Sequence, residues 1–229
     1  MGALLGYRRE ETRALQLATM FYNSGNYGIP LMSLSYPVTG LPMQVFIILA
    51  QNIGNFTIGL LLASSAHTRG WRAVLPMLRQ ISLWAVGTAL LIRAFHVPIQ
   101  EVRWIWVPLE YFSQALVGLA LVTLGAQMAS VTVPPNFTRI GWAVGLRLLG
   151  GPLLACALVG VFGFHGEIAR IMILSASFPT AVNTALIAHE FKADGHFAAA
   201  AVFYSTVASM FTVTVIIAVL RLPQVAAIF

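Results

Sequence analysis

Charged residues are scarce in this 229-residue sequence, where 9% are Asp, Glu, Lys or Arg and 59% are apolar. A soluble domain carries about 25% charged residues. Mean hydropathy is +0.83, which predicts an all-α membrane protein rather than a soluble one. The single cysteine, Cys156, lies in an apolar segment. It excludes a disulfide framework and a thiolate metal site, so we expect it to pack.

The motifs of hydrolases are also missing. The sequence contains no His-Glu-x-x-His, no Gly-x-Ser-x-Gly and no paired carboxylates within an apolar span. Four of the histidines (His67, His96, His165 and His196) lack metal-ligand spacing. We therefore predict that the protein is not an enzyme and needs no cofactor or metal.

The net charge of +6 does not indicate nucleic acid, because the basic residues lie between apolar stretches. Such residues act as orientation signals and headgroup contacts. They predict a multi-pass protein of the plasma (inner) membrane with its C-terminus outside. The predicted cytoplasmic segments are residues 8–13, 66–79, 130–138 and 189–195. We expect His189 and Glu190 to lie in a solvated loop, with proton coupling as the alternative.

Apolar stretches of about 20 residues predict membrane-spanning helices. The sequence contains seven of these apolar stretches, at residues 12–36, 43–65, 79–96, 107–129, 139–163, 167–190 and 196–220. Residues 1–6 have the composition of the end of a further span.

Polar residues interrupt two of these stretches. Residues 21–30, Phe-Tyr-Asn-Ser-Gly-Asn-Tyr-Gly-Ile-Pro, break the first, and residues 175–184 break the sixth around Pro179. Proline and glycine weaken helices, and backbone groups freed at membrane depth must face protein or water. Each break is either a proline kink with locally repaired hydrogen bonds or a ligand site. Two half-helix N-termini meeting at mid-membrane would attract an anion without a lysine.

The two breaks occupy equivalent places in a faint internal repeat. Residues 1–72 align with residues 158–229 without a gap, and Phe21 then meets Phe178 while Asn26 meets Asn183. A five-span unit begins near Arg79, and its partner would begin about 78 residues before Met1. We therefore expect two repeats of opposite topology in a full-length relative, with the sequence truncated at its N-terminus.

Residues 23–31, Asn-Ser-Gly-Asn-Tyr-Gly-Ile-Pro-Leu, resemble the Asn-x-Gly-Asn-x-Gly-(Leu/Ile)-Pro-Leu signature of the auxin efflux carrier family. That family includes plant PIN carriers and bacterial malonate or malate permeases. Residues 124–129, Arg147 with Pro152, and residues 178–183 are similar to three further stretches of the family.

The resemblance implies an inverted-repeat transporter, bile acid/auxin carrier-like, with two crossing broken helices. Residues 1–78 would be the end of the N-terminal repeat, and residues 79–229 a complete C-terminal five-helix repeat. It also implies a homodimer in the lipid bilayer and a moving crossover domain that carries a small organic anion, such as a mono- or dicarboxylate. Coupling to Na⁺ or H⁺ stays open. The alternative is a truncated, non-transporting remnant or a membrane scaffold partner.

Arg147 lies inside a span, where an ionisable group suggests function, and the alternative is snorkelling to the interface. Asn52 and Asn55 share one helix face, either to line a cavity or to bond between helices. The predicted substrate-binding residues are Asn23, Gly25, Asn26, Gly28, Pro30, Asn52, Arg147, Pro179, Thr180 and Asn183.

Overall fold

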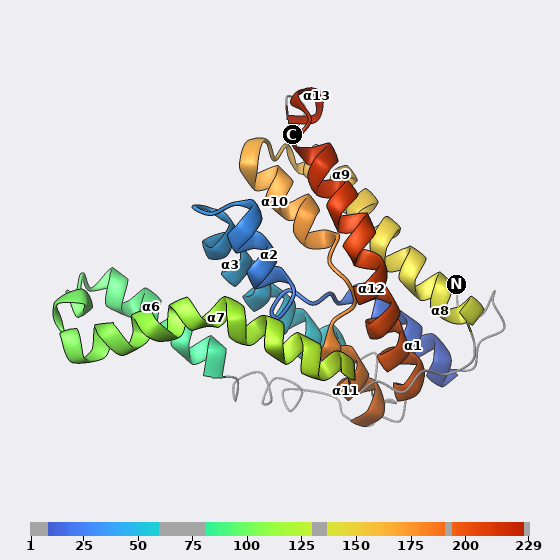
Figure 1. Ribbon diagram of the computed structural model, residues 1–229, viewed down its shortest axis with the longest axis horizontal. Coiled ribbons are helices and arrows are strands. Elements are labelled where there is room, and N and C mark those ends of the chain that lie inside the picture. The colour runs from blue at the N-terminus through green and yellow to red at the C-terminus, as the bar shows by residue number, and fades with distance from the viewer. Residues whose placement is uncertain (1–8, 60–80, 130–136, 191–193, 227–229) are drawn as a thin grey trace.

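The computed structural model describes residues 9–59, 81–129, 137–190 and 194–226. These residues form helices and no named strand, as the composition predicts. Figure 1 shows their arrangement. The helices are α1 (Arg9–Met20), α2 (Gly28–Ser35), α3 (Gly40–Gly54), η1 (Asn55–Gly59), α6 (Ile81–Ala94), η3 (Ile99–Glu101), α7 (Arg103–Ala129), α8 (Phe137–Gly145), η4 (Leu146–Gly150), α9 (Gly151–Phe162), α10 (Gly166–Ala176), α11 (Val182–Glu190), α12 (Gly195–Leu220) and α13 (Pro223–Ala226).

Two helical stretches of the described residues are long and apolar enough to cross a membrane. One is Phe137–Phe162, which joins α8, η4 and α9 into one rod, and the other is α12. Both lie within two residues of the predicted spans 139–163 and 196–220. The structure does not test the other five predicted spans or the inverted repeat, which remain predictions. Segments 1–6, 66–79 and most of 130–138 lie outside the described residues.

The first and sixth predicted spans are each divided into two short helices. α1 ends at Met20 and α2 begins at Gly28, while α10 ends at Ala176 and α11 begins at Val182. The structure therefore has both interruptions where the sequence predicts them. Figure 1 shows the two linkers, one blue and one orange, crossing in the middle of the molecule.

Small side chains bring α1, α8 and α12 close together on one side of this crossing. The buried residues of the cluster include Ala14, Ala18, Ala143, Ala200 and Ala201. Alanine at a helix interface lets backbones approach closely, which is the usual way that membrane helices gain packing contacts. This close packing holds the C-terminal end of α1 beside the long rod.

A second buried cluster joins α2, α9, α10 and α12. Phe178, which is fully buried, lies in the second linker and packs with Met32, Ile173 and Val213. The Phe178 ring also contacts the rings of Tyr22 and Tyr27, with centroids 6.2 and 5.5 Å away. The aromatic side chain of one linker is therefore anchored against the other linker.

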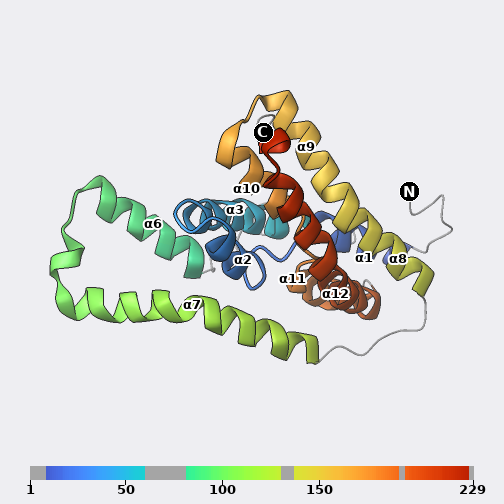
Figure 2. The ribbon, with the colours of Figure 1, turned by 45° about the horizontal axis from the view of Figure 1, so that its top comes forward.

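Helices α6 and α7 extend away from the remaining helices as a two-helix arm, which is clearest in Figure 2. Large apolar side chains on this arm are exposed, including Trp84, Trp104, Phe112 and Val122. α7 packs against α2. In a membrane these exposed side chains can face lipid, which is as apolar as they are.

Gly28 gives the clearest prediction about the fold, because a side chain there would collide with the core. A Cβ atom at Gly28 would lie 2.5 Å from Gln44 Nε2 and 2.7 Å from the Phe178 ring. We expect Gly28→Ala to destabilise the protein by about 1–3 kcal/mol through overpacking. Thermal unfolding in detergent measures this loss.

The matched control is Gly25→Ala in the same linker, where nothing lies within 4 Å of the new Cβ. We expect this variant to unfold near the wild-type temperature. Equal loss in both variants would show that the tight packing around Gly28 is not what makes glycine necessary there.

Candidate anion site at the helix crossing

Two backbone hydrogen bonds join the linkers at the crossing. The N–H of Asn23 donates to the carbonyl of Pro179 at 2.8 Å, and the N–H of Ala181 donates to the carbonyl of Phe21 at 3.0 Å. Tyr22 and Thr180 thereby form an isolated antiparallel bridge. Segments almost 160 residues apart thus supply each other with the partners that a broken helix lacks.

Local sequence explains why the chain leaves the helix at these points. Pro179 has no N–H to continue α10, and its ring would collide with the preceding turn. Gly25 and Gly28 weaken the helix in the other linker. Pro30 lies in the first turn of α2, where the missing N–H costs little. The chain therefore resumes a helix after each break.

The last carbonyls of α1 and α10 are bonded by side chains. The Thr180 hydroxyl donates to the carbonyl of Ala18 at 2.8 Å, and the Thr180 N–H donates to Ser205 Oγ at 3.0 Å. Arg147 Nη1 donates to the carbonyl of Thr19 at 2.9 Å, and Nη2 donates to that of Ala176. The last carbonyls of α1 and α10 are thereby bonded by Thr180 and Arg147.

Two glutamines of α3 hold the first linker in place. Gln44, which is fully buried, donates from Nε2 to the carbonyl of Ser24 at 2.7 Å and accepts from the Ser175 hydroxyl at 3.1 Å. Gln51 donates to the carbonyl of Tyr22 and accepts from the Ser24 hydroxyl at 2.5 Å. The backbone of the linker is therefore held by two side chains that each donate one hydrogen bond and accept another.

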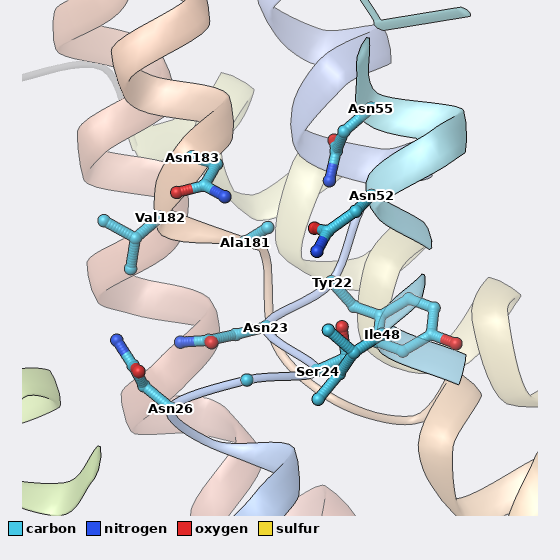
Figure 3. Close-up of a pocket in the computed structure, with 11 residues that line it drawn as sticks. Tyr22, Asn23, Ser24, Asn26, Ile48, Asn52, Asn55, Ala181, Val182 and Asn183 are labelled. Carbon is cyan, nitrogen blue, oxygen red and sulfur yellow. The ribbon is translucent and has the colours of Figure 1, made fainter. Parts of the chain in front are cut away.

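A cavity of about 210 Å³ lies beside the crossing. Figure 3 shows Asn52 and Asn55, from α3 and η1, on one side and Asn183 and Asn23 on the other. The cavity is lined by Tyr22, Asn23, Ser24, Gly25, Asn26, Ile48, Asn52, Asn55, Ala181, Val182 and Asn183.

The chemistry of this cavity is that of amides and helix ends. Five of its lining residues are asparagines, and none is Asp, Glu, Lys, Arg or His. Val182 and Asn183 are the first residues of α11, so the positive end of that helix dipole borders the cavity. Amide N–H groups and a helix N-terminus together favour a negatively charged ligand such as a carboxylate.

Two of the amide side chains each have an unpaired polar atom. Asn23 Nδ2 and Asn55 Oδ1 are buried and make no hydrogen bond to the described residues, although their side chains are only 6% and 2% exposed. A buried polar group without a partner costs about 1–3 kcal/mol. A carboxylate oxygen could accept a hydrogen bond from Asn23 Nδ2, whereas Asn55 Oδ1 would need a donor.

The structure separates the ten predicted site residues into two groups. Asn23, Gly25, Asn26, Asn52 and Asn183 line the cavity. The other five shape the crossing without lining it; these are Gly28, Pro30, Arg147, Pro179 and Thr180.

Arg147 differs most from its two sequence-based interpretations. It is 4% exposed and bonded to two helix-end carbonyls, so it neither snorkels to an interface nor lines the cavity. Sequence reasoning gave no role to Gln44, which lies in an apolar part of α3. It grouped Gln51 with Asn52 and Asn55, as residues that either line a cavity or bond between helices. Among the described residues, no group of three His, Cys, Asp or Glu could hold a metal ion.

Comparison with known proteins places residues 74–217 in a family model described as membrane transport protein. The chain is 27% identical over 200 residues to an uncharacterized transporter of Methanothermobacter thermautotrophicus, covering 87% of the chain and 65% of that protein. It is 25% identical over 214 residues to a putative malonate transporter of Rhizobium meliloti, covering 89% and 66%. A probable auxin efflux carrier component 5b of Oryza sativa is 31% identical over 104 residues, covering 43% and 27%. The chain thus spans less than two thirds of the length of these relatives.

The glutamine support of the first linker gives a testable prediction. Gln44→Met keeps the side-chain volume but leaves the Ser24 carbonyl and the Ser175 hydroxyl without their partner. We expect a loss of stability of about 1–3 kcal/mol, measured as a lower unfolding temperature in detergent. Gln100→Met, at an exposed position in η3, is the control and should unfold like the wild type. A Gln44→Met variant as stable as this control would contradict the proposed support.

Proposed function

Because the chain belongs to the auxin efflux carrier family of membrane transport proteins, we propose that it carries a small organic anion across a membrane. The proposed substrate is a mono- or dicarboxylate, and the proposed location is the plasma membrane, which the chain would span several times. The observation that carries this proposal is the cavity at the crossing, where five amides and the N-terminus of α11 surround a space of about 210 Å³.

Three features of the cavity support an anion rather than a cation or a neutral solute. No acidic side chain lines it, so a cation would find no counter-charge there. The positive end of α11 lies at its edge. Asn23 Nδ2 is a buried donor without a protein partner, and it can bond a carboxylate oxygen. The printed name of one relative, a putative malonate transporter, agrees with this class of substrate.

Transport requires that the cavity open alternately to the two sides. The crossing unit, made of α1, α2, α10 and α11, is held together by backbone bonds and by side chains of its neighbours. We propose that this unit moves as one body, by rocking or by an elevator motion, past the arm of α6 and α7, which packs against it through α2. Rigid movement around a broken-helix site is the usual mechanism of inverted-repeat transporters.

Uptake into proteoliposomes that contain the purified protein tests this function. The panel includes labelled acetate, lactate, malonate and malate, each with and without a sodium gradient and with and without a pH gradient. We expect saturable uptake of at least one acid, and the gradient arms identify any coupling ion. Uptake no greater than in protein-free liposomes for every acid would contradict the proposal.

Removing single amides from the cavity should weaken binding of the transported anion. A hydrogen bond to a charged group contributes about 1.5–3 kcal/mol, so we expect Asn23→Ala and Asn183→Ala each to raise KM by about tenfold or more. Thr88→Ala, which removes an exposed polar group on α6, serves as the control and should keep the wild-type KM. Unchanged KM in both asparagine variants would place the anion elsewhere.

A further inference from the structure

We propose that Arg147 is a positioning residue that clamps the C-terminal ends of α1 and α10 together and cancels their negative dipole charge. The positive end of α11 then acts on the cavity without opposition. The clamp and its effect on the sign of the cavity are both argued from the geometry, and only the importance of that sign for a carried anion rests on the proposed function, which it deepens.

The clamp consists of three contacts of one buried guanidinium. Nη1 donates to the carbonyl of Thr19 at 2.9 Å, and Nη2 donates to the carbonyl of Ala176. These carbonyls belong to the last turns of α1 and α10. Cζ lies 5.1 Å from the centre of the Tyr22 ring, within the range of a cation–π contact. One side chain therefore touches both helix ends and the first linker.

The charge of Arg147 has no carboxylate partner in the described part of the chain. The ion pair found there joins Arg139 to Glu11. A buried charge is costly unless other groups compensate it. The compensation available to Arg147 is the pair of carbonyl ends and the face of Tyr22, which are negative without being ionised.

The amounts of charge match. Each helix C-terminus carries about half a negative charge, so the two ends together carry about one, equal and opposite to the guanidinium. Each helix N-terminus carries about half a positive charge. With the C-terminal ends neutralised by Arg147, the remaining field at the crossing is positive, and α11 begins at the cavity wall.

Gly151 makes the clamp sterically feasible. A Cβ atom at Gly151 would lie 2.6 Å from the Ala176 carbonyl oxygen and would also collide with Arg147 Nη2. At the neighbouring Gly150, and at Gly145 one turn earlier, nothing lies within 4 Å of such an atom. Of these three glycines, only Gly151 lies where a side chain would collide with the Arg147 guanidinium.

The π-helical turn η4 (Leu146–Gly150) places Arg147 at this point. It interrupts the regular register of the rod between α8 and α9. An inserted π turn rotates the following side chains relative to an unbroken α-helix and is frequent at functional sites. Arg147 and Leu148 are both buried in this turn, while Leu149 is 60% exposed.

The steric part of the proposal is tested by thermal unfolding of four variants in detergent. We expect Arg147→Met and Gly151→Ala each to lower the unfolding temperature by about 4 °C or more. Gly150→Ala is the matched control and should unfold within about 1 °C of the wild type. The double variant Arg147→Met/Gly151→Ala should lose clearly less than the two single losses combined, because Gly151 acts partly through Arg147. Additive losses, or equal losses at positions 150 and 151, would overturn the clamp.

The electrostatic part is tested without any substrate by the reactivity of a cysteine placed in the cavity. In a Cys156→Ala background, Asn183→Cys is alkylated by iodoacetamide over a range of pH, and the midpoint of the rate profile reports the local potential. A unit charge acting over roughly 10 Å at an effective dielectric constant of about 20 moves such a midpoint by about one pH unit. We therefore expect Arg147→Met to raise the midpoint by about one unit, and Arg147→Lys to retain most of the wild-type value.

A cysteine at Thr88 on α6 is the control, and its midpoint should not respond to Arg147. An unchanged midpoint at position 183 in Arg147→Met would overturn the electrostatic role, because a purely structural residue leaves it unmoved. A shifted midpoint in a protein that transports none of the acids tested would instead overturn the proposed function while leaving this inference intact.

Discussion

Backbone groups at membrane depth must all find partners, and this constraint governs the centre of the structure. Lipid offers no hydrogen bonds, so an interrupted helix is tolerated only where protein or water replaces the lost ones. Here each interrupted segment supplies backbone hydrogen bonds to the other, between Asn23 and Pro179 and between Ala181 and Phe21. Among the described residues, the backbone of each linker finds its bridge partner in the other linker, so the two interruptions depend on each other. The hydroxyl of Thr180 and the guanidinium of Arg147 complete the helix ends.

The pairing of the two linkers also forms one wall of the cavity beside the crossing. The side chains that bond the last carbonyls of α1 and α10, Thr180 and Arg147, do not line the cavity, whereas the start of α11 lies at its wall. No full positive charge lines the cavity, so the proposed anion would be held by amides and a helix dipole and would still be able to leave. The glutamines of α3 hold the linker backbone through bonds to the carbonyls of Ser24 and Tyr22. Such preorganisation suits the proposed movement of the crossing unit as one body.

Sequence alone predicted the all-helical class, the family resemblance and the location of both interruptions, because each leaves a local signal. Low charge marks the class, and Pro179, Gly25 and Gly28 mark the breaks. It named Asn23, Asn26, Asn52 and Asn183 as candidate substrate-binding residues, with interhelical bonding as the alternative for Asn52, and the structure places all four at the cavity. The assignment of a ligand to these residues remains a prediction. The role of Arg147 could not be predicted, because a π turn sets its direction and no sequence period announces one. The function of Gln44 depends on a carbonyl 20 residues away, which only the fold brings near it.

The central claim is that Tyr22 and Thr180 lie opposite each other in an antiparallel bridge, and disulfide formation tests it most directly. Opposed residues of this kind have Cα atoms about 4.5 Å apart, within the range that a disulfide spans. In a Cys156→Ala background, the pair Tyr22→Cys and Thr180→Cys should form an intramolecular disulfide in native membranes under mild oxidation, identified by mass spectrometry of the linked peptides. The pair Tyr22→Cys and Thr88→Cys should form none. Free thiols at both bridge positions in the folded protein would contradict the crossing.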